Sequence, residues 1–115
     1  MTTDVNFDVA ERDESGMPVL AVRGEVDVST APELRERLLG LAERGKTLAV
    51  VDLSEVSFVD STALGVLVSG VKRLRSSGGD LRLVVSQPHI SKVFEITGLT
   101  EVFSIFPTLD AAVAG

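Results

Sequence analysis

Apolar and polar positions alternate with two different periods along the chain, and the changes of period predict a succession of strands and helices. Near the N-terminus, Val5–Val9 alternates with period two, and Val19–Arg23 is a second apolar run beyond the charged segment Glu11–Gly16. We predict that these two runs pair as a β-hairpin and that the charged segment connects them. Further strands are predicted at Leu48–Leu53, Asp80–Val85 and Glu101–Phe106.

Helical periodicity fills the intervals between the later strands. Leu34, Leu38 and Leu41 share one helix face, after a capping-box pair formed by Thr30 and Glu33. Further helices are predicted at residues 62–75 and 88–98 and around 109–113. A hairpin followed by alternating strands and helices predicts a single α/β domain over residues 1–115. Its sheet is mixed, with an N-terminal hairpin, later strands that are parallel through right-handed crossovers, and helices packed on the sheet.

The helix predicted from Thr62 to Arg75 has two unlike faces at 100° per residue. Its expected core face holds Ala63, Val66, Leu67, Gly70, Val71 and Leu74. The opposite face holds Ser61, Gly65, Ser69 and Lys72, with Leu64 and Val68 expected as an apolar rim. Gly65 is notable there, because a glycine inside a helix costs roughly 1 kcal/mol of stability relative to alanine. At an exposed position, its lack of a side chain lets the surface of another protein approach closely. This face is therefore predicted to dock a partner.

The residues Asp60, Ser61 and Thr62 stand where that helix begins, and one of them is expected to cap it. A plain helix cap is the commonest explanation for a serine such as Ser61. Asp27 and Asp52 likewise suit turn or capping positions. In a sheet of parallel strands, however, functional groups gather at the carboxyl ends of the strands, so Asp27, Asp52 and Ser61 are candidates for one common edge.

Composition narrows the classes of partner and location. The formal net charge is −6 with only eleven Lys and Arg, which argues against binding nucleic acid or anionic membranes. The chain has no cysteine, so disulfides and thiolate metal sites are excluded. The N-terminus lacks the pattern of a signal peptide, and no apolar run approaches the roughly 18 residues of a membrane span. We therefore expect a cytoplasmic protein without a membrane anchor.

Several kinds of chemistry lack their residues. His89 is the one histidine, and Ser61 lacks the Gly-x-Ser-x-Gly elbow, so neither a hydrolase triad nor a zinc site is predicted. Phosphate-binding glycine motifs are missing too, and no cofactor is expected. A response-regulator receiver is a competing interpretation, because Val50–Leu53, with Asp52, resembles the receiver strand whose terminal aspartate accepts phosphate. It is disfavoured because Asp8 has no acidic neighbour for Mg²⁺ and Ser86–Pro88 contains no lysine.

Three segments together resemble a STAS domain of the bacterial anti-sigma factor antagonist family. They are Gly24–Leu34 with its Gly-Glu-x-Asp start, Val50–Gly65 with Asp60-Ser61, and the Thr-Gly-Leu ending of Phe94–Leu99. The resemblance covers nearly the whole chain. Its most specific part is Asp60-Ser61 followed by small and apolar residues through Gly65.

The resemblance implies a regulator that works by binding and is not an enzyme. Ser61 would be phosphorylated by an anti-sigma factor that is itself a serine kinase and that supplies Mg-ATP. The unphosphorylated chain would bind this kinase and release the sigma factor, and a PP2C-type phosphatase would reset the cycle. Asp27 matches an aspartate that assists docking or phosphorylation in the family, and Thr62 is a second possible acceptor. The alternative is a STAS module that serves as a constitutive scaffold or transport-complex subunit, in which Ser61 is only a cap.

Overall fold

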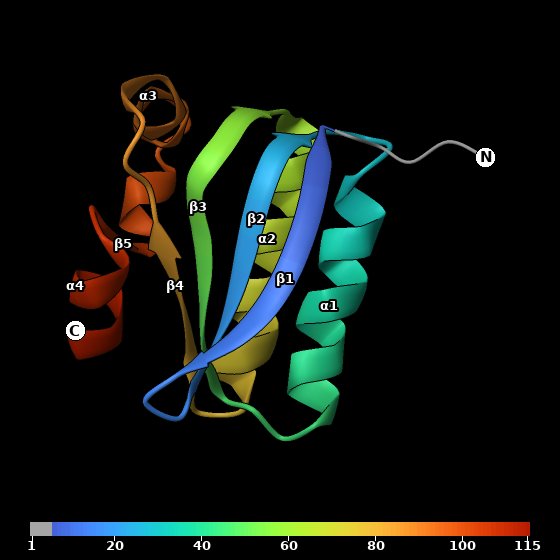
Figure 1. The fold of residues 1–115 in the computed structure, drawn as a ribbon, viewed down its shortest axis with the longest axis vertical. Coiled ribbons are helices and arrows are strands. Elements are labelled where there is room, and N and C mark those ends of the chain that lie inside the picture. The colour runs from blue at the N-terminus through green and yellow to red at the C-terminus, as the bar shows by residue number, and fades with distance from the viewer. Residues whose placement is uncertain (1–5) are drawn as a thin grey trace.

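A five-stranded mixed sheet with helices on both faces forms the protein (Figure 1). The computed structural model describes residues 6–115. Its elements are β1 (Phe7–Glu14), β2 (Met17–Val26), α1 (Ala31–Glu43), β3 (Leu48–Val59), α2 (Ser61–Ser76), β4 (Asp80–Val84), α3 (Pro88–Ile96), the 3-10 helix η1 (Leu99–Glu101), β5 (Ser104–Phe106) and α4 (Leu109–Ala114). The strands lie in the order β1-β2-β3-β4-β5, with β1 and β2 antiparallel and all other neighbours parallel. The predicted fold class is confirmed.

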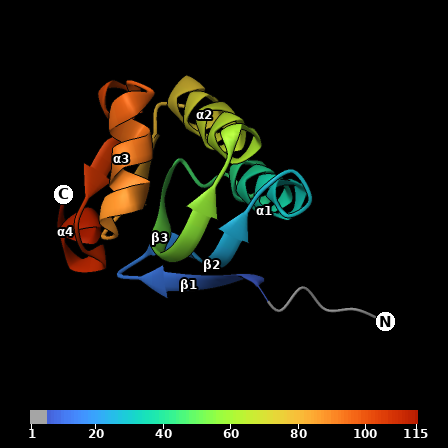
Figure 2. The ribbon, with the colours of Figure 1, turned by 90° about the horizontal axis from the view of Figure 1, so that it is seen from above.

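The helices cover the two faces of the sheet unequally. Figure 2 shows α1 and α2 side by side over one face, where Leu34, Leu67 and Val71 join Val51 in the main core. Helix α3 adds Ile90 and Phe94 to the same cluster. On the other face, Ala112 of α4 packs on a smaller cluster of Val19, Val50 and Val84. None of the helices described is both long and apolar enough to cross a bilayer.

The N-terminal hairpin is longer than predicted. Strand β1 extends through Glu14, so the charged segment is mostly strand and only Ser15 and Gly16 form the turn, with φ of 57° and 87°. The charges are tolerated because β1 is an edge strand and only Val9 among its residues is buried. Val5, where the run was predicted to begin, lies outside the described residues.

Strand β3 is twice as long as the predicted Leu48–Leu53 segment. We expected a turn or irregular link after Leu53, but the strand continues to Val59. Its pairing with β2 shifts register between Ala21 and Arg23 and again between Gly24 and Glu25, and each shift adds one residue on the β3 side. These bulges break the period-two pattern, which is why the sequence concealed the second half of the strand.

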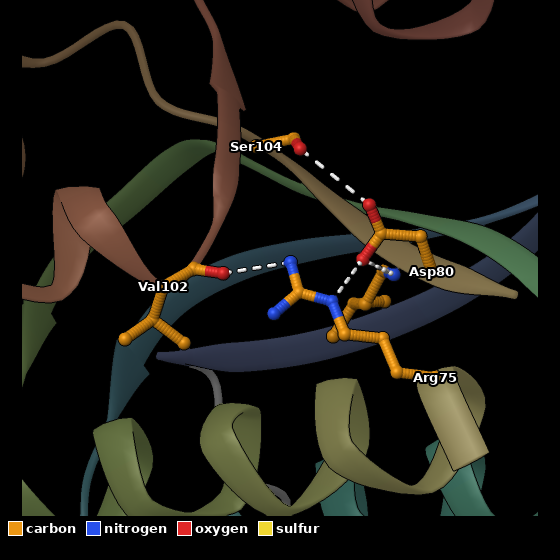
Figure 3. Close-up of polar contacts among 5 residues, drawn as sticks. Arg75, Asp80, Val102 and Ser104 are labelled. Carbon is orange, nitrogen blue, oxygen red and sulfur yellow. Dashed lines mark hydrogen bonds and ion pairs between the residues drawn. The ribbon is translucent and has the colours of Figure 1, made fainter.

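The C-terminal strand is shorter than predicted. Residues 99–101 form η1, and only Ser104–Phe106 pairs with β4, so the expected strand at Glu101–Phe106 is wrong in its first half. Figure 3 shows one contact that occupies this segment: the Arg75 guanidinium donates to the Val102 carbonyl oxygen at 2.7 Å and to Asp80 Oδ1 at 2.9 Å. The end of α2 is thereby tied to β4 and to the segment before β5.

Candidate functional site

The carboxyl ends of β2 and β3 bring two connections together at one edge of the sheet. Val26 pairs with Val59, and the Asp60 N–H donates to the Val26 carbonyl oxygen at 3.2 Å. Asp27 and Asp60 follow directly on these two strand ends. The β2–α1 connection and the start of α2 are therefore neighbours, as a site at the carboxyl ends of parallel strands requires.

Asp60 is the residue that caps α2. Its Oδ1 accepts a hydrogen bond from the Ala63 N–H at 3.0 Å, and its backbone is extended, as an N-cap position demands. The expectation that Ser61 serves as a cap is therefore wrong. Ser61 is the first residue of α2, it is exposed, and within residues 6–115 its hydroxyl makes no hydrogen bond.

Asp27 organises the turn between β2 and α1. Its Oδ1 accepts hydrogen bonds from the Ser29 hydroxyl at 2.8 Å, the Ser29 N–H at 2.9 Å and the Thr30 N–H at 3.1 Å. The two bonds from Ser29, with further bonds from Thr30, hold the pKa of Asp27 below its ordinary value. A lowered pKa means that this carboxylate stabilises the fold above the ordinary aspartate pKa, and that the contribution is lost as pH falls through the lowered value.

The predicted capping box at the start of α1 does not form. The Thr30 side chain makes no cap hydrogen bond to the helix; it donates instead to the Glu25 carbonyl oxygen at 2.9 Å and accepts from the Asp27 N–H at 2.9 Å. Asp27, three positions before Thr30, takes over the free N–H groups of the turn. This leaves Glu33 without the reciprocal role that the pattern suggested.

The outward face of α2 carries most of the predicted partner-binding residues. Ser61, Thr62, Gly65, Ser69 and Lys72 are all exposed. Val68 is partly buried against the core. Leu64 is buried, with 9% of its surface exposed, so its expected role as an exposed apolar rim is wrong. Leu64 belongs to the main core cluster, together with residues of the sheet and of α1, α2 and α3.

Asp52 does not join this edge. It lies inside β3, opposite Ala21 and Val84, and is 8% exposed, with Oδ1 accepting from the Ser54 N–H at 3.0 Å. The unpredicted second half of β3 separates it from Ser61. A receiver domain needs an aspartate at the end of this strand, and Asp52 instead lies inside it. His89 is exposed, with Nε2 lying 2.8 Å from the Ser57 carbonyl oxygen.

Two apolar residues at the same edge were missed by the sequence reasoning. Val28, in the β2–α1 connection, is 70% exposed, and Phe58, next to the end of β3, is 47% exposed. Phe58 pairs with Glu25 one position before the Val26–Val59 pair. Val28 could have been found as an apolar residue directly after Asp27 in a predicted connection, but the irregular link expected after Leu53 hid the place of Phe58 in β3. Val28 and Phe58 replace Leu64 as exposed apolar surface near Ser61.

Comparison with known proteins identifies the family of the chain. Residues 7–112 match the STAS domain family. An anti-sigma-B factor antagonist of Bacillus subtilis is 40% identical over 102 residues, which are 89% of this chain and 91% of that protein. The chain therefore belongs to the STAS domain family, and within it to the anti-sigma factor antagonists.

Solved structures agree in fold. The crystal structure of an anti-sigma factor antagonist from Mycobacterium paratuberculosis has a TM-score of 0.88 and 29% identity, and the match covers 99% of this chain and 97% of that one. The Bacillus cell fate determinant SpoIIAA in its phosphorylated form has a TM-score of 0.70 and 22% identity, with 94% of this chain and 96% of that one covered. At that identity the second likeness concerns the fold alone.

Proposed function

We propose that this antagonist is switched by phosphorylation of Ser61. In the unphosphorylated form it binds an anti-sigma factor that is a serine kinase and thereby releases the sigma factor. The kinase holds Mg-ATP and transfers phosphate to Ser61, which ends binding, and a PP2C-type phosphatase restores the hydroxyl. In this cycle, which takes place in the cytoplasm, the chain is a substrate and a binding partner and performs no catalysis of its own.

The observation that carries the proposal is the state of the Ser61 hydroxyl. It is exposed, it makes no hydrogen bond in the described part of the chain, and it stands at the first position of α2. Because Asp60 caps the helix, adding phosphate to Ser61 removes no capping bond. A helix N-terminus also stabilises negative charge by roughly 0.3–1 kcal/mol at an exposed site. The fold is therefore expected to survive phosphorylation.

The surroundings of Ser61 explain why added charge would end binding. Phosphate adds about −1.5 to −2 charges at pH 7. These charges would stand near the carboxylates of Asp27 and Asp60 and at the same edge as the exposed apolar side chains of Val28 and Phe58. A partner that covers this edge would have to desolvate a dianion, which is costly without a matching cation. Loss of affinity with little change of structure is the expected result.

The direct test is to incubate the chain with its candidate kinase and Mg-ATP and to locate the phosphate by mass spectrometry. We expect phosphate on Ser61, none on the Ser61→Ala variant, and undiminished phosphorylation of Thr62→Ala. Phosphate on Thr62 alone, or on neither residue with an active kinase, would contradict the proposal.

Binding measurements separate the switch from a constitutive scaffold. Ser61→Ala is expected to bind the kinase as the parent chain does, and Ser61→Asp to bind at least about tenfold more weakly. Equal affinities of the two variants in calorimetry would favour the scaffold, because charge at Ser61 would then have no effect on docking.

A further inference from the structure

A groove runs between α1 and α2, and its α2 side begins at Val66, beyond the first turn that carries Ser61. It is lined by Arg35 and Leu39 of α1 and by Val66, Ser69, Gly70 and Arg73 of α2. Figure 2 shows the two helices running side by side above the sheet. A Cβ atom at Gly70 would lie 3.0 Å from Leu38 Cδ1, so the glycine keeps the space between the helices open.

The size of this hollow suits one amino-acid side chain. Its volume is about 90 Å³. Sites for small molecules typically enclose about 300–1,000 Å³, so a free metabolite would be poorly enclosed here. A single branched aliphatic side chain from another protein would contact Leu39 and Val66 and would remove their apolar surface from water.

The charges along the groove are positive and unpaired. Three nearby arginines have partners: Arg37 donates to the Val9 carbonyl oxygen, Arg44 at the end of α1 pairs with Glu11, and Arg75 pairs with Asp80. Arg35 and Arg73 are exposed, and neither makes an ion pair or side-chain hydrogen bond within residues 6–115. In a chain whose net charge is −6, these two guanidinium groups form a local positive site beside apolar surface.

We propose that this groove docks an acidic segment of the anti-sigma factor, with one aliphatic side chain in the hollow and carboxylates on Arg35 and Arg73. The inference rests on the proposed function for the identity of the partner. It extends the docking surface away from Ser61, because Ser69 belongs both to the outward face of α2 and to the groove. The positive groove would attract an acidic segment that the rest of this acidic chain repels.

The test is a calorimetric titration of the unphosphorylated chain with its anti-sigma factor. The double variant Arg35→Gln/Arg73→Gln is expected to bind about fivefold more weakly at low salt, with a shallower salt dependence of affinity. The matched control is Arg12→Gln/Arg44→Gln, which removes the same net charge from exposed positions outside the groove. It is expected to bind within twofold of the parent.

A second measurement locates the contact directly. Amide hydrogen exchange in the complex should slow within residues 66–73 for the parent chain and slow less for the groove double variant. Equal affinities of the two double variants, or unchanged exchange at residues 66–73, would overturn the groove proposal while leaving the Ser61 switch intact. Weak binding of the groove variant together with normal binding of Ser61→Asp would overturn the switch and keep the groove.

Discussion

At the start of α2, two adjacent residues have separate tasks. Asp60 satisfies a free N–H of the helix, and Ser61 presents a hydroxyl that the fold does not use. If Ser61 were the cap, its phosphorylation would disturb the capping hydrogen bond. The added charge would then also change the stability of α2. Because the cap is a different residue, the proposed phosphorylation of Ser61 would leave the capping bond of α2 in place.

This division predicts the stability of two variants of the cap. Asp60→Ala removes the acceptor for the Ala63 N–H and should lower the free energy of unfolding by about 1 kcal/mol, whereas Asp60→Asn keeps an oxygen acceptor and should lose much less. Urea denaturation followed by circular dichroism measures both. Ser61→Ala is the matched control and should leave stability nearly unchanged. A larger loss for Ser61→Ala than for Asp60→Ala would contradict the assignment of the cap.

The sequence could not decide which residue caps the helix. Asp60, Ser61 and Thr62 are all short polar residues with good capping preference. The choice of cap depends on where β3 ends. Strand β3 ends at Val59, which forms the last pair with β2, opposite Val26, where β2 also ends. That pairing is a tertiary contact, so the local pattern identified the right three residues and left the assignment open.

Among the elements, the β1–β2 pair depends on a glycine in the middle of a strand. Gly24 has φ of 96°, and a Cβ there would lie 1.5 Å from the Asn6 carbonyl oxygen. That same oxygen accepts the Glu25 N–H at 2.7 Å. The close approach of the two backbones explains why a glycine opens the Gly-Glu-x-Asp segment. It also holds the end of β2, just before Asp27, against the start of β1.

Gly24→Ala should therefore be strongly destabilising, by more than about 3 kcal/mol, because a Cβ would meet backbone atoms that cannot move aside. Gly16→Ala is the matched control, since its φ is also positive, at 87°, but no atom lies within 4 Å of the added carbon. It should cost only the roughly 1–2 kcal/mol of a left-handed alanine. Thermal unfolding of the two variants compares them, and similar midpoints would show that the close approach to Asn6 has no energetic weight.

For the molecule as a whole, exposed apolar surface is concentrated near the proposed acceptor. Three large apolar side chains are exposed among the described residues: Val28, Phe58 and Ile96. Val28 and Phe58 lie at the edge that carries Ser61, and Ile96 lies at the end of α3. The fold gains nothing from leaving Val28 and Phe58 in water, which supports their use in binding a partner.

The variants Val28→Ser and Phe58→Ser should each weaken binding of the anti-sigma factor by about tenfold, the scale expected for a buried interface residue. Val28→Ser should change stability by less than about 0.5 kcal/mol, because Val28 is 70% exposed in the free chain, whereas Phe58→Ser removes an aromatic side chain that is only 47% exposed and lies in a strand, and should cost more. Ile96→Ser, at 75% exposure, is the matched control and should bind normally. A loss of affinity for Ile96→Ser equal to that for Phe58→Ser would show that the partner does not distinguish this edge.

The sequence predicted the order of the elements, the mixed sheet and the exposed position of Ser61, because these follow from local periodicity and turn residues. It misjudged Leu64 and overlooked Phe58 for one shared reason. Both positions depend on contacts between segments distant in sequence: the pairing with β2 that extends β3 as far as Val59, and the core cluster that buries Leu64. Exposure and burial near the end of β3 are thus the features least visible from local pattern.

The two bulges in β3 also constrain how this chain can vary in length. They give β3 two more residues than β2 between the Ala21–Asp52 and Val26–Val59 pairs, yet the strands finish level. Because side chains alternate between the faces of a strand, deleting a single residue from this interval would exchange Phe58 and Val59 between solvent and core. Insertions and deletions of single residues should therefore be rare between Asp52 and Asp60.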